Sequence, residues 1–185
     1  MSKNPQKNLY YERYQIEDQM SMMEHISLRK KITKDLLIDM SKFYSFVSIF
    51  IEQSKHTLDL SIGSSRDLLY FKDKSDYIVG VDSNQELINR AITLDFEAYK
   101  MNDFEIPKKI NKKFNLVYGT EVFVSKNKNE IKLILKSLSS FLEKSSYIIF
   151  IADKNIDFSK ITKPYRFLDL EEFNSNLNMV ALEKI

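Results

Sequence analysis

The sequence predicts an α/β fold built on a mostly parallel β-sheet, and two observations lead to this prediction. Short apolar runs alternate with helical patterns over about the last two thirds of the 185-residue chain. Strands that alternate with helices favour a parallel sheet with right-handed crossovers, which is a doubly wound arrangement. In addition, the chain holds only three glycines, and Gly63 directly follows the first apolar run of this region. We therefore expect the loop around Gly63 to be structurally important.

The individual elements follow from the spacing of apolar residues, which differs between strands and helices. The expected strands are 57–61, 77–82, 97–101, 114–118, 147–152 and 178–184. The expected helices between them are 65–72, 84–93, 127–143 and 169–177.

The region before the first strand has a helical pattern. Apolar residues recur there at spacings of three and four, at Leu28, Ile32, Leu36, Leu37 and Met40. Such a stripe is typical of helices that pack against a neighbouring domain. We expect an N-terminal helical extension over 1–55 and one compact α/β domain over 56–185.

Composition narrows the classes of function. Without cysteine, the chain has no disulfide, no thiolate zinc site and no cysteine nucleophile, and no metal site is predicted. No apolar run approaches the length of a membrane span, and the first residues do not form a signal peptide, so a cytoplasmic protein without membrane contact is expected. The formal net charge of +2 is too small to indicate nucleic-acid binding by itself. Local lysine clusters, such as 108–113 and 126–132, either contact phosphates or form solvated surfaces.

The end of the first expected strand is the first candidate site. The segment from Asp59 to Ser65 turns from strand into helix, which brings backbone N–H groups to the edge of the sheet where such folds bind ligands. Gly63 supplies a position with free φ. The alternative is an ordinary turn in which Ser65 caps the following helix.

Three further strand ends carry candidate residues. Asp82 follows the loop by about twenty residues, a position suited to accept hydrogen bonds from ribose hydroxyls, although it is also placed to cap the next helix. Asn102, Asp103 and Phe104 suit an adenine ring, or form a polar turn. Glu121 follows the fourth strand, where it either faces a bound ligand or points to solvent.

These four segments, in this order, resemble class I S-adenosylmethionine-dependent methyltransferases over 57–185. Asp59, Gly63, Asp67 and Leu68 match the first motif of the family, and Ser61 and Ser65 replace its outer two glycines. The resemblance implies a Rossmann-like fold and S-adenosylmethionine as cofactor. It implies that the cofactor contacts Asp59, Ser61, Gly63, Ser65, Asp82, Ser83, Asn102, Asp103, Phe104 and Gly119.

The sequence also departs from the family pattern. Val124 and Ser125 stand where many members have a Glu-His pair, and no pattern indicates the seventh strand that normally completes the edge of the sheet. A sheet without that last edge strand is therefore one expected form of the fold.

The resemblance implies transfer of a methyl group to an O, N or C atom of an acceptor, with a small molecule favoured and RNA as the alternative. Candidate catalytic residues are Glu121, His25 and Tyr14, the last two because the extension often covers the site in related enzymes. One competing hypothesis is an inactive, methyltransferase-like subunit that binds or regulates a partner, either a second copy of itself or another protein. Another is a dinucleotide-binding domain, which is weaker because the loop lacks G-x-G-x-x-G.

Overall fold

The computed structural model describes residues 40–101, 106–107, 109–124, 126–161 and 163–185. A helical stretch covers 40–50, and the compact unit that holds the sheet begins at Phe46. This second unit is described below by itself. No helix in the described part of the chain has both the length and the apolar character needed to cross a lipid bilayer.

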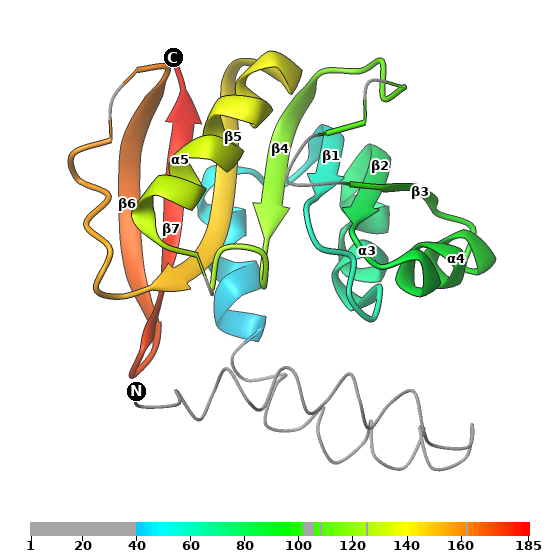
Figure 1. Cartoon of the computed structure of the whole chain (residues 1–185), viewed down its shortest axis with the longest axis horizontal. Helices are drawn as coiled ribbons and strands as arrows, with labels where there is room; N and C mark the ends of the chain where they lie inside the picture. The colour runs from blue at the N-terminus through cyan, green and yellow to red at the C-terminus, as the bar shows by residue number, and fades with distance from the viewer. Residues whose placement is uncertain (1–39, 102–105, 108, 125, 162) are drawn as a thin grey trace. The chain divides into compact units, whose positions relative to one another are not determined.

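A sheet of seven described strands forms the centre of this unit (Figure 1). Its order is β3-β2-β1-β4-β5-β7-β6, and all the contacts from β3 to β5 are parallel, whereas β7 runs antiparallel to both of its neighbours. The strands are β1 (Ser54–Asp59), β2 (Ser75–Asp82), β3 (Glu97–Lys100), β4 (Phe114–Gly119), β5 (Leu142–Asp153), β6 (Tyr165–Asn174) and β7 (Leu177–Lys184). This order confirms the doubly wound, mostly parallel sheet.

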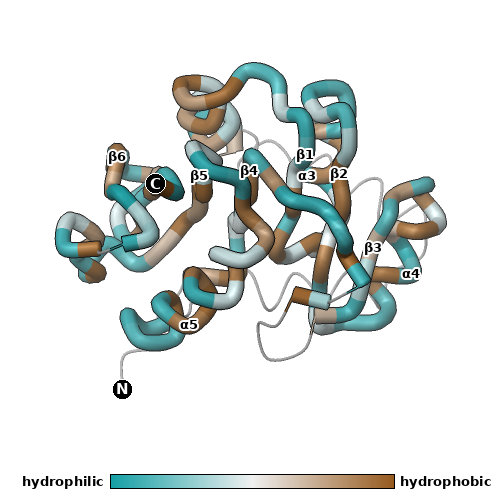
Figure 2. The backbone as a smooth tube through the Cα atoms, turned by 90° about the horizontal axis from the view of Figure 1, so that it is seen from above, coloured by the Kyte–Doolittle hydropathy of each residue, from teal (hydrophilic) through white to brown (hydrophobic). Residues whose placement is uncertain are grey.

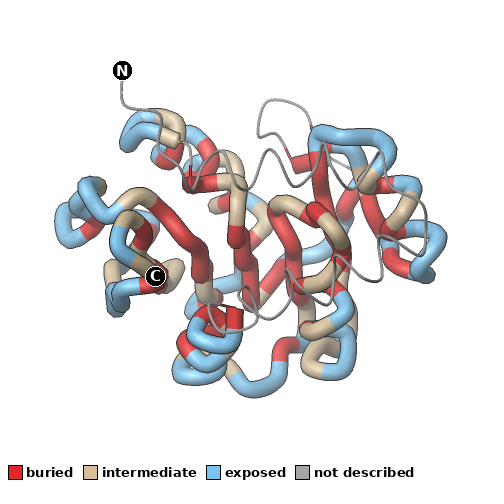
Figure 3. Tube along the Cα trace, turned by 90° about the horizontal axis from the view of Figure 1, so that it is seen from below, coloured by how far each residue is buried: buried red, intermediate tan, exposed pale blue. Residues whose placement is uncertain are grey.

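Helices cover both faces of the sheet, as the alternation of patterns predicted. α3 (Arg66–Phe71) and α4 (Gln85–Thr93) supply Leu68, Ile88 and Ala91 to one apolar cluster. α5 (Lys128–Leu138) packs Ile131 and Leu135 into the larger cluster on the opposite face. Figure 2 shows α5 on one side of the row of strands, and Figure 3 shows the buried residues concentrated along the central strands. The central strands read as continuous apolar runs because helices bury both of their faces.

The connection from β5 to β6 differs from the helical crossovers. β5 and β6 run in the same direction on either side of β7. Parallel strands are usually joined by a helix, but the described residues between Asp153 and Tyr165 form turns and irregular backbone. Phe158 anchors this connection to the sheet. Its side chain is 5% exposed, and the centroid of its ring lies 5.4 Å from that of Phe150. The large cluster is therefore covered by α5 and by a non-helical segment.

The C-terminal edge of the sheet corrects the sequence analysis. The predicted helix at 169–177 is wrong, and a sheet without its last edge strand is wrong as well, because 165–174 forms β6 and pairs with β7. The hairpin turns at Asn174, whose side chain accepts the N–H groups of Asn176 and Leu177. β6 shows no alternation of buried and exposed residues, because it is mostly exposed and its register with β7 shifts at two places.

The remaining elements agree with prediction apart from their ends. β1 begins three residues earlier than expected, at Ser54, and ends at Asp59. The helix expected over 127–143 ends at Leu138, and a short 3-10 turn leads into β5 at Leu142.

Candidate functional site

The turn between β1 and α3 has an unusual backbone. Gly63 has φ of 50° and Ser65 has φ of 62°, so two residues of one short loop lie in the left-handed region. Glycine adopts this region freely, whereas a serine there is strained. The N–H of Ser65 donates to the carbonyl of Ile62 at 2.9 Å, which closes the turn. The side chain of Ile62 packs against Gly80 of β2, where an added Cβ would lie 2.5 Å from Ile62 Cγ1. The loop is therefore fitted closely to the neighbouring strand.

Ser65 is the least satisfied polar residue of this loop. Its side chain is fully buried, and its hydroxyl is the one buried side-chain polar atom without a hydrogen-bond partner among the described residues. It occupies the N-cap position of α3 but makes no capping bond through its side chain. The expected alternative, a serine that caps the helix, therefore does not account for it. A buried unpaired hydroxyl is costly, and such groups in native proteins require an explanation.

Asp59 lies beneath the loop at the end of β1. It is 1% exposed, and its two carboxylate oxygens accept hydrogen bonds from the backbone N–H of Ser61 at 3.0 Å and the hydroxyl of Tyr118 at 3.0 Å. Burial, and then the nearby carboxylate of Asp67, raise the pKa of Asp59 well above its ordinary value. Tyr118 comes from β4, so Asp59 links the loop to the next strand of the sheet.

Asp82 ends β2 and connects two loops. Its Oδ2 accepts the backbone N–H of Gly63 at 3.4 Å, and its Oδ1 accepts that of Asn84 at 2.8 Å. Burial raises the pKa of Asp82, and these backbone hydrogen bonds act in the opposite direction. Asn84, and not Asp82, is the N-cap of α4, since the side chain of Asn84 accepts the N–H of Glu86 at 2.9 Å. Asp82 instead stands beside Gly63, and its contact with a ribose stays a prediction.

Asp67 and Thr120 form a contact that the sequence alone does not predict. The hydroxyl of Thr120, in the turn after β4, donates to Asp67 Oδ2 at 3.0 Å. Arg66 donates to both oxygens of the same carboxylate, at 2.8 and 3.2 Å. Asp67 is 4% exposed. This contact joins the start of α3 to the turn that carries Glu121. One sign of this contact is visible in the sequence: Asp67 is an acidic residue just after the loop, in the motif that begins at Asp59.

The site brings together three acidic residues from three elements. Asp67 and Asp82 both act on Asp59 through their charge. The described residues hold no group of three or more carboxylate or imidazole side chains placed to bind a metal ion. The raised pKa of Asp59 favours its protonated form and Arg66 pairs with Asp67, so these three side chains act at the site mainly as hydrogen-bonding groups.

The other candidate residues have different positions. Ser61 is half-buried, Ser83 is exposed and Glu121 is partly exposed. Gly119 ends β4, where an added Cβ would lie 2.7 Å from Val122 Cγ1, so close packing explains this glycine. The remaining candidates lie outside the described residues, namely Asn102, Asp103, Phe104, His25 and Tyr14.

Comparisons with known proteins give matches in structure and none in sequence. No family model matches the chain, and no curated protein matches it. Among solved structures, the DhpI–SAH complex is 9% identical, with a TM-score of 0.66 over 85% of this chain and 90% of that one.

Two further structures have the same arrangement. The N-methyltransferase NodS from Bradyrhizobium japonicum WM9, in complex with S-adenosyl-L-homocysteine (SAH), is 9% identical, with a TM-score of 0.59 over 84% of this chain and 86% of that one. An rRNA methylase from Streptococcus thermophilus is 10% identical, with a TM-score of 0.56 over 80% of this chain and 97% of that one. Together with the strand order and the antiparallel β7, these matches show that the chain has the fold of class I S-adenosylmethionine-dependent methyltransferases.

Proposed function

We propose that the chain is an S-adenosylmethionine-dependent methyltransferase that uses the loop between β1 and α3 to hold its cofactor. The observation that carries the proposal is the buried, unpartnered hydroxyl of Ser65, at the position of a family glycine. A bound ligand that accepts a hydrogen bond from this hydroxyl would provide the partner that the protein itself does not supply. Gly63, with its left-handed φ, leaves room for close approach to the backbone of the same loop.

The acidic residues fit the parts of such a cofactor. Asp82 is buried at the end of β2 beside Gly63. There its carboxylate can accept hydrogen bonds from ribose hydroxyls as well as from backbone N–H groups. Asp59 lies beneath the same loop and accepts the N–H of Ser61, so it would hold the loop in position against the cofactor. When bound, S-adenosylmethionine supplies the electrophilic methyl group.

The protein's own contribution is binding, alignment and exclusion of water. The contact between Thr120 and Asp67 fixes the turn after β4, and this turn carries Glu121. Glu121 is the candidate among the described residues for orienting an acceptor or taking a proton from it. His25 and Tyr14 remain candidates from the extension.

We infer that a small molecule is the favoured acceptor and that RNA is the alternative. Solved neighbours include both an N-methyltransferase and an rRNA methylase, so the fold leaves both classes open. The formal net charge of +2 favours the small molecule, because proteins that bind RNA through phosphates usually carry a larger excess of positive charge.

Calorimetric titration with S-adenosylmethionine and SAH tests the proposal. We expect binding of both ligands in the micromolar range, and Asp82→Ala should weaken it by about 1–3 kcal/mol, the scale of losing hydrogen bonds to a charged group. Asp76→Ala, at an exposed position of the same strand, is the matched control and should leave the affinity unchanged. Absence of binding by the folded chain would contradict the proposal, and equal affinity of the folded Asp82→Ala variant would contradict the ribose assignment.

A further inference from the structure

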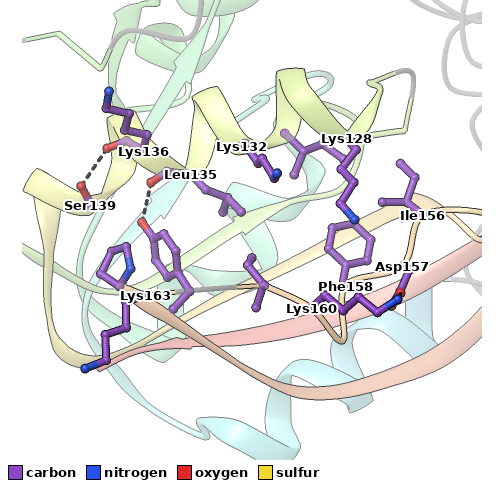
Figure 4. Close-up of a pocket in the computed structure, with 14 residues that line it drawn as sticks. Lys128, Lys132, Leu135, Lys136, Ser139, Ile156, Asp157, Phe158, Lys160 and Lys163 are labelled. Carbon is purple, nitrogen blue, oxygen red and sulfur yellow. Dashed lines mark hydrogen bonds and ion pairs between the residues drawn. The ribbon is translucent and has the colours of Figure 1, made fainter.

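A pocket of about 460 Å³ lies on the face of the sheet that α5 covers. One wall is α5 and the other is the non-helical connection from β5 to β6, as Figure 4 shows. None of its lining residues belongs to the loop between β1 and α3 or to Asp59, Asp67, Asp82 or Thr120. The pocket is therefore separate from the candidate cofactor site, and nothing in the proposed function uses it.

The floor of the pocket is apolar. Ile131 and Leu135 of α5 and Phe158 of the connection are all at most 5% exposed. The ring of Tyr165 completes this floor, and its hydroxyl is satisfied by the carbonyl of Leu135 at 2.5 Å. Because these four side chains are almost fully buried, the accessible apolar area of the pocket comes from the partly exposed Ile156 and Ile161. An apolar lining of this kind is usual in a site for a small organic ligand.

The rim of the pocket is strongly basic. Five lysines line it: three from α5, spaced four residues apart, and two from the connection, namely Lys128, Lys132, Lys136, Lys160 and Lys163. In Figure 4, Lys128 extends from the helix toward Phe158. The one acidic lining residue, Asp157, pairs with Lys160 at 3.5 Å. No hydrogen bond or ion pair joins the side-chain ammonium groups of the other four to any described residue, so most of this positive charge is uncompensated.

We propose that this pocket binds an amphiphilic anion, a ligand with an apolar chain or ring and one carboxylate or phosphate group. The apolar body would lie against Ile156 and Ile161, and the anionic group would meet the lysines of the rim. The volume lies within the range of small-molecule sites. A nucleic-acid backbone would use the lysines but would leave the apolar floor without a partner, and the observed combination therefore favours the amphiphile.

Dodecyl phosphate, below its critical micelle concentration, is a direct probe of the proposal. We expect saturable binding at one site by calorimetry, with amide chemical-shift changes confined to α5 and to 156–165. Dodecanol and dodecyltrimethylammonium, which have the same chain with no charge and with positive charge, should bind at least about tenfold more weakly. Equal binding of all three compounds would overturn the charge assignment. Displacement by a short polyuridylate, but not by dodecanoate, would assign the lysines to nucleic acid instead.

Variants separate the two halves of the pocket. The double variant Lys132→Glu/Lys160→Glu should weaken the binding of dodecyl phosphate at least about tenfold. Lys55→Glu, at an exposed position of β1 that does not line the pocket, should not weaken it. Ile156→Trp should block the cavity without changing the charge. Saturating SAH should leave the affinity for dodecyl phosphate unchanged. The pocket is therefore tested independently of the methyltransferase assignment. Unchanged affinity for dodecyl phosphate in both folded variants, Lys132→Glu/Lys160→Glu and Ile156→Trp, would overturn the proposal.

Discussion

Ser65 combines two local penalties in one residue. A left-handed φ of 62° is strained for any residue with a Cβ, and the buried hydroxyl has no partner in the protein. A glycine at this position would remove both penalties. A serine at this position is understandable if its hydroxyl binds a ligand. A substitution of Ser65 should therefore change stability and ligand affinity in opposite directions.

Ser65→Gly should stabilise the fold and weaken the cofactor. We expect the free energy of unfolding to rise by about 1 kcal/mol, since relief of strain and of the unpaired hydroxyl outweighs the greater entropy of the unfolded chain. The affinity for SAH should fall by about 1 kcal/mol, the value of one hydrogen bond. Urea unfolding and calorimetry measure the two effects. Ser64→Gly, whose φ is not positive, is the control and should not stabilise. Tighter SAH binding by Ser65→Gly would mean that the serine crowds the ligand.

Asp59 makes stability depend on pH. Its pKa in the folded state lies above the ordinary 3.8, because of burial and then the carboxylate of Asp67. Between these two values, the folded state keeps a proton that the unfolded state has released, so the free energy of unfolding falls as pH rises through this window. Asp59→Asn removes this titration and should make the decline shallower in urea unfolding from pH 4 to 7. Asp76→Asn is the exposed control, and a parallel profile for Asp59→Asn would refute the assignment.

At the scale of elements, α5 has a well-defined start. The side chain of Asn127 accepts the N–H groups of Asn129 and Glu130 at 2.9 and 3.1 Å, and Glu130 accepts the N–H of Asn127 at 2.8 Å. This reciprocal capping box satisfies N–H groups that the first turn of a helix leaves free. Since α5 covers the large apolar cluster and forms one wall of the lysine-rimmed pocket, its start affects both stability and the pocket.

Asn127→Ala should lower the free energy of unfolding by about 1 kcal/mol, the usual effect of losing an N-cap side chain. Asn129→Ala, two residues further on and exposed, should be neutral or slightly stabilising, because alanine is the better helix former. Chemical denaturation of both variants makes the comparison. Equal losses for the two would show that the capping box contributes little.

The elements also show how far the sequence could predict the fold. The parallel strands were predictable from the sequence, because strands that are buried on both faces appear as apolar runs bounded by polar turns. β6 was not, because residues such as Leu168, Leu170 and Glu172 have high helix propensity and the strand is exposed along most of its length. Its two register shifts also interrupt the alternation that would identify a strand.

The candidate site was predictable in part for a similar reason. Asp59, Gly63 and Asp82 follow buried strands at a recognisable spacing, and the structure places Asp82 in contact with Gly63. The bond between Thr120 and Asp67 was not predictable, because it joins residues 53 positions apart and depends on the packing of α3 against the turn after β4. The strain at Ser65 is likewise a property of the folded backbone, which a single residue letter does not reveal.

At the scale of the whole molecule, the sheet ends in an exposed edge strand that carries negative charge. Asp169, Glu171 and Glu172 of β6 are exposed, and their neighbour Leu170 is 38% exposed. Charged side chains on an edge strand discourage the pairing of its free backbone groups with another chain. The acidic residues therefore protect an edge that the sheet would otherwise offer for association.

The double variant Asp169→Thr/Glu171→Thr should associate more strongly than the unsubstituted chain, because threonine favours strands and removes the repulsion at the edge. Sedimentation velocity over a range of concentrations measures the increase in apparent mass. Asp73→Thr/Asp76→Thr changes the net charge equally at exposed positions away from this edge and should not associate. If both pairs behave alike, charge on the edge has no special effect.

The packing of Ile62 against Gly80 has an evolutionary consequence. The two residues lie in different motifs, one in the loop between β1 and α3 and the other two positions before Asp82, yet no side chain fits at position 80 while Ile62 Cγ1 occupies its place. A mutation that adds a methyl group at position 80 would push on Ile62, and through it on the residues next to Gly63. We therefore expect positions 62 and 80 to change together. A relative without the glycine at position 80 should carry a residue smaller than isoleucine at position 62.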